Sequence, residues 1–447
     1  MACRIIRPIG VRIRKFLDNA NLETKPHQVY GIKWCVKREG VGGVGGIVAD
    51  EMGLGKTILM IGLMSVNIKP RTLIVLPPIL ITQWSDQIYK MTGHRAVIYH
   101  GQNKKKVTLS LLNDSRVVLA SYNAVAINKK HSFATTLLHS VEWSRIIFDE
   151  AHHLRNKKTS VFNGASMLNS SVRWLVTGTP IQNRMKDFYN LCAILKLEPA
   201  VYRDPANYPS FMIKRSRTCC ERSGGEAEIG LVSHASAVSW AKKEEEELSL
   251  SVHESLKNSV GDKLPWFLKA RQVCVLPQLV DSRVMSTSKL DSVCDFILAR
   301  KDDGNGKLVF CSFRKEIDVM YQKLVEGGAG SVVILDGRVT AKQKSRILEE
   351  RNDVMIVQIN TGCEGLNLQE HYSEVYFVSP HWNPSVEDQA VARCHRFGQT
   401  KSVNVHRFHM SQDESMDQYV TLLQGKKRML YSTFSTQPLE KVEPNIN

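Results

Sequence analysis

The sequence predicts an α/β protein with two parallel-sheet lobes and a mainly helical insertion between them. Short β-branched runs alternate with helical patterns over residues 25–198 and again over 289–435, as expected for parallel sheets covered by helices on both faces. The length of 447 residues favours two or three domains at about 150 residues each. We expect a short basic segment at 1–24, lobe 1 at 25–198, the insertion at 199–288, lobe 2 at 289–435 and a tail at 436–447.

The individual elements follow from the same patterns. Each apolar run ends at a turn signal or at a helix start. Residues 199–288 lose the strand pattern, and the charge run at 242–247 is typical of a solvated helix face. The predicted strands cover residues 46–49, 72–76, 96–99, 116–120, 145–148 and 173–176 in lobe 1, and 307–311, 332–335, 354–359, 374–378 and 403–409 in lobe 2.

Composition and charge narrow the class of protein. With 43% apolar and 23% charged residues, the chain is neither disordered, collagenous nor membrane-spanning. Its net charge of +16 favours a polyanionic partner, either nucleic acid or an acidic membrane surface. The ten cysteines form no C-x-x-C pair, so we expect reduced intracellular thiols and no zinc module. The longest apolar run, 72–81, contains two prolines and is too short to span a bilayer.

A phosphate-binding loop is the strongest chemical signal. Residues 50–57 read Asp-Glu-Met-Gly-Leu-Gly-Lys-Thr, between a short strand and an apolar helix. The glycines allow backbone N–H groups to face an anion, the lysine reaches the β- and γ-phosphates, and the threonine hydroxyl can bind Mg²⁺. Asp50 stands where the usual pattern has a glycine. We therefore predict a nucleotide site formed by Asp50, Glu51, Met52, Gly53, Leu54, Gly55, Lys56 and Thr57.

An acidic pair follows the strand at 145–148 and strengthens this prediction. Asp149 would hold Mg²⁺, and Glu150 would orient and deprotonate the attacking water, because phosphoryl hydrolysis depends on positioning and charge stabilisation.

The Thr-Gly-Thr-Pro sequence at 177–180 is, by itself, ordinary turn chemistry. Arg393 and Arg396 lie three residues apart, and on one helical face they could meet a single anion.

Together these motifs resemble the Swi/Snf-type (Snf2-family) ATPases, helicase-like motors of superfamily two, over residues 25–430. The segments 360–368 and 381–384, leading into the arginines, are specific to that family. The resemblance implies two RecA-like lobes, ATP and Mg²⁺ as cofactors, adenine recognition by Gln28, Arg393 and Arg396 as catalytic fingers, and a brace helix at 414–428. It also implies DNA contacts by Pro77, Trp84, Ser121, Tyr122, Thr361, Asn367 and Trp382.

The predicted activity is ATP-dependent movement along double-stranded DNA, which would displace or remodel nucleosomes or other DNA-bound proteins. No RING or chromatin-reader module fits the short flanks, so the chain resembles compact members found in large DNA viruses. The family implies a nuclear location, or a viral factory or virion for a viral source. Two alternatives remain. One is a strand-separating DNA or RNA helicase; the other is a non-catalytic nucleic-acid-binding scaffold, which the intact motif residues disfavour.

Overall fold

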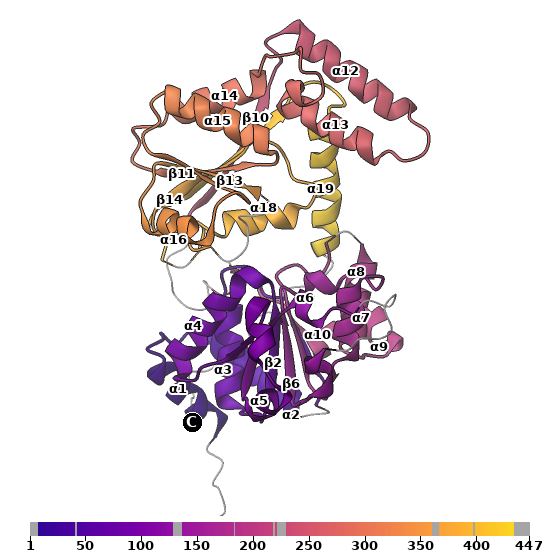
Figure 1. The fold of residues 1–447 in the computed structure, drawn as a ribbon, viewed down its shortest axis with the longest axis vertical. Helices are drawn as coiled ribbons and strands as arrows, with labels where there is room; N and C mark the ends of the chain where they lie inside the picture. The colour runs from indigo at the N-terminus through magenta and orange to yellow at the C-terminus, as the bar shows by residue number, and fades with distance from the viewer. Residues whose placement is uncertain are drawn as a thin grey trace, which may run out of the picture. The chain divides into compact units, whose positions relative to one another are not determined.

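The computed structural model describes residues 8–40, 43–127, 136–182, 184–217, 220, 229–359, 366–396 and 398–432. The chain divides into two compact units (Figure 1). The first unit comprises Met1–Glu228 with Leu430–Asn447, and the second comprises Ile229–Met429. Each unit contains one parallel sheet, so the predicted α/β class with two parallel sheets is confirmed.

The first sheet has seven strands in the order β3-β4-β2-β6-β8-β1-β9, all parallel to their neighbours. The strands predicted in lobe 1 are present to within two residues. A separate pair, β5 (Glu142–Trp143) and β7 (Asn169–Ser170), was not predicted. The strands of the sheet are β1 (Gly45–Val48), β2 (Thr72–Leu76), β3 (Val97–Tyr99), β4 (Val117–Ser121), β6 (Arg145–Asp149), β8 (Arg173–Val176) and β9 (Met212–Ile213).

Alternation along the inner strand β2 explains the unbroken apolar run at residues 73–76. Leu73 and Val75 enter one buried cluster, whereas Ile74 and Leu76 enter the cluster on the opposite face. Both faces are covered by helices, so every position is buried. In Figure 1, α3 and α4 lie on one side of this sheet and α6 and α7 on the other. The helices of the unit are α1 (Ile9–Asn19), α2 (Pro26–Gly40), α3 (Lys56–Val66), α4 (Ile81–Thr92), α5 (Leu109–Asp114), α6 (Tyr122–Val125), α7 (Ser160–Met167), α8 (Met185–Ile194), α9 (Pro199–Arg203) and α10 (Tyr208–Phe211).

The second sheet has six parallel strands in the order β10-β15-β14-β11-β13-β12. Its strands are β10 (Leu231–Val238), β11 (Gly306–Cys311), β12 (Val332–Leu335), β13 (Val354–Gln358), β14 (Tyr372–Phe377) and β15 (Val403–Met410). Its helices are α12 (Lys243–Asn258), α13 (Leu264–Val275), α14 (Ser288–Leu298), α15 (Arg314–Glu326), α16 (Ala341–Glu349), α18 (Pro384–Val391) and α19 (Met416–Ser432). The last helix covers residues 416–428 of the segment 414–428 that was predicted as the brace helix.

The expectation that residues 199–288 lack strands is wrong at two places. β9 extends the first sheet beside β1, and β10 forms the edge of the second sheet beside β15. β10 has the sequence Leu-Val-Ser-His-Ala-Ser-Ala-Val, and most of its residues are exposed. An edge strand with little burial needs no apolar alternation, so periodicity gave no signal for it. The helices α12 and α13 agree with the predicted helical character of this segment.

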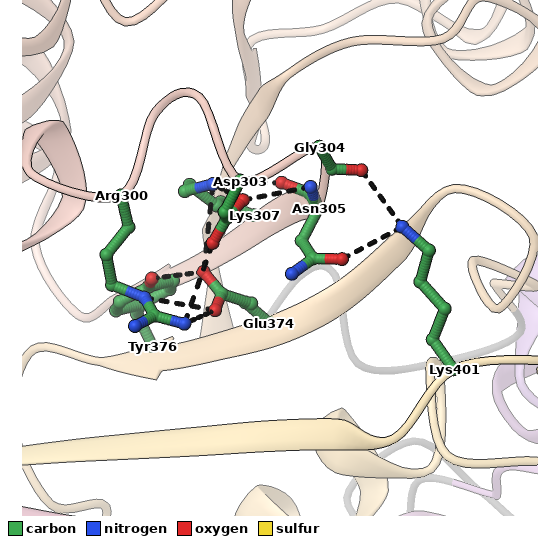
Figure 2. A network of polar contacts seen from close by, with 8 residues as sticks. All are labelled: Arg300, Asp303, Gly304, Asn305, Lys307, Glu374, Tyr376 and Lys401. Atoms are coloured by element: carbon green, nitrogen blue, oxygen red, sulfur yellow. Dashed lines mark hydrogen bonds and ion pairs between the residues drawn. The ribbon is translucent and has the colours of Figure 1, made fainter.

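A buried polar network ties β11 to β14 in the second unit (Figure 2). The carboxylate of Glu374 is fully buried and accepts hydrogen bonds from Arg300 Nε at 3.1 Å and from the Tyr376 hydroxyl at 2.6 Å. Lys307 Nζ lies 3.7 Å from the same carboxylate and donates to Asp303 over 2.9 Å. The buried charges are therefore paired and hydrogen-bonded, as burial requires.

Candidate nucleotide site

The predicted phosphate loop turns at two glycines. Gly53 has φ +87° and Gly55 has φ +75°, both in the left-handed region that favours glycine. A Cβ atom on Gly55 would lie 2.5 Å from Nε2 of Gln28. Gln28, on α2, therefore packs directly against the loop from which α3 begins. The structure thus brings together the predicted adenine-recognising glutamine and the phosphate loop.

Lys56 is held against the loop that precedes it. Its Nζ donates to the backbone carbonyl of Asp50 over 2.9 Å and to that of Glu51 over 3.2 Å. A Cβ atom on Gly178 would lie 3.5 Å from the same Nζ. The Thr-Gly-Thr-Pro turn after β8 therefore faces the lysine of the loop, although its sequence alone indicated only a turn.

Asp50 has a structural partner that the sequence motif did not reveal. Its fully buried carboxylate accepts hydrogen bonds from Arg215 Nε at 2.9 Å and from the Arg215 backbone N–H at 3.1 Å. The Glu51 backbone N–H donates to the Arg215 carbonyl over 3.0 Å. Arg215 follows β9, so this ion pair ties the edge strand to the loop. The ion pair also explains why residue 50 is an aspartate where the usual loop has a glycine, because the Asp50 side chain fixes the loop to Arg215.

The acidic motif lies at the carboxyl end of β6. One carboxylate oxygen of Asp149 accepts a hydrogen bond from Trp84 Nε1 at 2.7 Å, and the other accepts one from the Glu150 backbone N–H at 3.0 Å. Burial, followed by the nearby charge of Glu150, raises the pKa of Asp149 to about 7. The hydrogen bond from Trp84 and the positive charge of Lys56 act in the opposite direction. Asp149 is therefore within the electrostatic reach of the phosphate-loop lysine.

Glu150 occupies an unusual backbone conformation. Its φ of +49° lies in the left-handed region, which only a few per cent of non-glycine residues adopt. Its Oε2 lies 3.3 Å from Nδ1 of His152 in the short helical turn Ala151–Leu154 that follows. Residues in such conformations are frequent at functional sites, where the surrounding structure maintains the strain.

The predicted DNA contacts of the first unit require correction. Pro77, Trp84, Ser121 and Tyr122 are all buried, and Trp84 is only 1% exposed. The Tyr122 hydroxyl donates to the Asp149 carbonyl over 2.6 Å, and the Ser121 hydroxyl lies 3.0 Å from His100 Nδ1. Side chains buried in this way are not available to a DNA surface. Trp84 and Tyr122 instead hold Asp149 in place, a role that required knowledge of the folded sheet.

In the second unit, the prediction that both arginines lie on a helix is wrong. α18 ends at Val391, and Arg393 and Arg396 occupy the turns that follow. Arg393 Nη1 donates to the Leu366 carbonyl over 3.4 Å, and Arg396 Nη1 donates to the Asn367 side chain. The arginines and the predicted Asn367 are thus brought together, whereas Thr361 lies outside the described residues.

Trp382 is only half-buried and packs at an angle against Phe267, with ring centroids 5.8 Å apart. The Arg271 guanidinium lies 5.6 Å from the centre of the Trp382 ring.

Over the ranges that the structure describes, no helix is long and apolar enough to cross a membrane. The same ranges contain no group of three or more His, Cys, Asp or Glu side chains placed to hold a metal ion.

Comparison with known proteins places these motifs in a family. The SNF2-related domain matches residues 27–352. The chain is 28% identical to the "Probable global transactivator" of Orgyia pseudotsugata multicapsid polyhedrosis virus, with 92% of this chain and 91% of that protein covered. It is 25% identical to the "ATP-dependent DNA helicase DDM1" of Arabidopsis thaliana, covering 87% of this chain and 59% of that protein.

The chain is also 25% identical to the "ISWI chromatin-remodeling complex ATPase ISW1" of Saccharomyces cerevisiae, covering 92% of this chain and 40% of that protein. It therefore spans most of the viral relative but only about half of the plant and yeast ones. The solved "Sulfolobus solfataricus SWI2/SNF2 ATPase core in complex with dsDNA" is 21% identical over 94% of this chain and 97% of that one, with a TM-score of 0.41. The match to the SNF2-related domain extends over most of the sequence, and the chain therefore belongs to the SNF2-related family of helicase-like, ATP-using enzymes, as predicted.

Proposed function

We propose that this protein is a DNA-dependent ATPase that uses ATP hydrolysis to move along double-stranded DNA. The observation that supports it most is the convergence of Gln28, Lys56 and Asp149 around one glycine loop in the first unit. These groups come from α2, α3 and β6, so the fold and not the sequence order brings them together. A scaffold without turnover would have no need of this arrangement.

The residues present fit a magnesium ion. Asp149 and Glu150 place two carboxylates side by side near Lys56, and Thr57 adds a hydroxyl in the first turn of α3. Oxygen donors of this kind are the ones that Mg²⁺ prefers. We propose Asp149 and Thr57 as the residues that hold it. When bound with ATP, Mg²⁺ neutralises charge on the β- and γ-phosphates.

The chain's own groups then have separate tasks. The N–H groups of the loop and Lys56 bind the phosphates, and Gln28 contacts the base. Glu150 accepts the proton of the attacking water. Arg393 and Arg396 would stabilise the charge that develops on the γ-phosphoryl group, the role of arginine fingers in such reactions. This last assignment rests on the family resemblance of residues 389–399.

The net charge of +16 supports DNA as the polymer along which the protein moves, because lysine and arginine side chains bind phosphates without recognising the base sequence. Nucleosomes or other DNA-bound proteins are the proposed load, in keeping with the yeast relative, which is named as the ATPase of a chromatin-remodeling complex. A nuclear location is proposed from the family resemblance, or a viral factory or virion for a viral source. Strand separation is the competing outcome, and release of a labelled strand from a duplex would demonstrate it.

Steady-state ATP hydrolysis tests the proposal. Double-stranded DNA should stimulate the wild-type rate well above its basal value, and the DNA affinity should fall about 10³-fold between 50 and 200 mM salt for about six phosphate contacts. Lys56→Ala should abolish ATP binding, whereas Glu150→Gln should retain ATP and lose turnover. Equal rates with and without DNA at low salt would contradict the proposal. Equal loss of ATP affinity in the two variants would contradict the assignment of Glu150.

A further inference from the structure

The first unit contains a cavity of about 500 Å³ at the edge of the sheet opposite to the phosphate loop. Thr72, Val117 and Arg145, which line it, are the first residues of β2, β4 and β6. The phosphate loop instead follows the carboxyl end of β1, and Asp149 is the last residue of β6. In a parallel sheet these are opposite edges, so the cavity is separate from the nucleotide site.

Positive side chains from several elements converge on this cavity. Arg12 and Lys15 come from α1, Lys90 from α4, Lys69 from the segment after α3, and Arg116 from the segment before β4. Among the residues that the structure describes, the lining has no aspartate or glutamate. Nor does any of these five cations form an ion pair within the described ranges. Like charges gathered without a counter-charge favour the binding of an anion.

The hydrogen bonds of Arg145 and Arg12 show which positive groups of the cavity already have partners. Arg145, at the base of the cavity, is neutralised by Glu39 through a hydrogen bond of 2.6 Å from its Nε. Arg12 donates from Nη1 to the Val66 carbonyl over 2.8 Å, while its buried Nε has no hydrogen-bond partner. A buried N–H group without a partner is unfavourable. Arg12 therefore offers a donor that a ligand oxygen could satisfy.

The cavity also has an apolar part. Phe16, Ile88 and Met91 are buried and contribute to its lining. A volume of about 500 Å³ is within the range of small-molecule sites, which combine apolar walls with a few placed polar groups. A DNA duplex is too wide to enter such a cavity and could reach only its rim. The small volume and the apolar part of the lining thus favour a small ligand over nucleic acid.

We propose that this cavity binds a small organic anion that carries two or more phosphate groups. The five unpaired cations bind the phosphates, and Phe16 and Met91 contact the organic part. Phosphate groups fit because they concentrate several negative charges and several acceptor oxygens in a small volume, which lysine and arginine donors match. This site is distinct from the one that binds ATP.

Inorganic tripolyphosphate is a suitable probe, titrated calorimetrically into the full chain carrying Lys56→Ala so that the phosphate loop contributes little. The double variant Lys69→Gln/Arg116→Gln should bind it about 100-fold more weakly, because a hydrogen bond to a charged group is worth about tenfold or more. The control Lys105→Gln/Lys106→Gln removes the same charge from exposed positions of the same unit, outside the lining. It should bind as the parent does. Equal affinity in both double variants would overturn the proposal.

Lysine acetylation read by mass spectrometry locates the site without relying on ATP turnover. Tripolyphosphate should protect Lys15, Lys69 and Lys90 from acetylation and leave Lys105 reactive. Protection of these lysines by duplex DNA and not by tripolyphosphate would overturn the proposal and identify a nucleic-acid surface. Equal protection by citrate would overturn the phosphate specificity. Neither result depends on DNA-stimulated hydrolysis, so the proposal can fail independently of the proposed function.

Discussion

Replacing Trp84 by phenylalanine separates two roles for this residue. The sequence resemblance places Trp84 at the DNA, whereas the structure buries it and directs its indole N–H to the Asp149 carboxylate at 2.7 Å. Phenylalanine retains an aromatic ring and removes the donor. Hydrogen bonds to charged groups contribute about 1.5–3 kcal/mol, so the free energy of unfolding of the first unit should fall by about that amount above pH 7, where Asp149 is mostly ionised.

The effect on catalysis should be larger than the effect on binding. Loss of a residue that orients a metal-binding carboxylate lowers activity by about 10- to 100-fold, and we expect the ATP turnover of Trp84→Phe in this range. DNA affinity, measured by fluorescence anisotropy, should remain at the wild-type value because the side chain is only 1% exposed. Weakened DNA binding with intact turnover would refute this reasoning.

Trp174 provides a matched control. Its indole N–H donates over 2.9 Å to another buried carboxylate of the same unit, that of Glu39. Trp174→Phe removes the same donor and the same ring volume, and should destabilise the unit to a similar extent. Its ATP turnover should remain near the wild-type rate at a temperature where the variant is folded. If both variants lose turnover equally, the effect belongs to stability and not to Asp149.

Two further predictions concern the stability of the second unit. Glu374→Gln leaves the positive charges of Arg300 and Lys307 without their buried partner. The free energy of unfolding, measured by urea titration, should fall by about 3 kcal/mol. A change below about 1 kcal/mol would contradict the pairing shown in Figure 2. Burial lowers the pKa of His406 from 6.5 to about 4. As the pH falls, His406 is therefore protonated in the unfolded chain before it is protonated in the folded protein. The free energy of unfolding should fall by up to about 3 kcal/mol between about pH 6.5 and about pH 4. His406→Phe should reduce this loss and match the wild type at pH 8; an unchanged pH profile would contradict the burial of a neutral His406.

The sheets could be predicted from sequence because their inner strands contain runs of consecutive apolar residues, such as 73–76 in β2 and 354–357 in β13. The edge strand β10 could not, because its exposed serines, histidine and alanines show no period. The helix α1 was missed for a different reason. The segment 1–24 was interpreted only as basic, although Ile13, Phe16 and Leu17 form one buried face at helical spacing.

The nucleotide site shows the same division. Local motifs indicated the loop and the acidic pair, because their chemistry requires residues adjacent in sequence. Trp84 and Arg215 reach Asp149 and Asp50 from 65 and 165 residues away. Such partners depend on strand order in the sheet, which a single sequence does not reveal. The arginines were placed on a helix by spacing, but α18 ends before them.

Single-turnover ATP hydrolysis with saturating duplex DNA tests most directly whether residues of both units act on one nucleotide. Arg396→Ala should retain the fold and near-normal affinities for ATP and DNA, and should lose about 10³-fold or more in rate. Arg346→Ala is the control, since its guanidinium forms an exposed pair with Glu350 in the same unit, and such pairs are worth little. Arg346→Ala should hydrolyse ATP at the wild-type rate. An Arg396→Ala enzyme that retains more than about a tenth of the wild-type rate would contradict a catalytic finger.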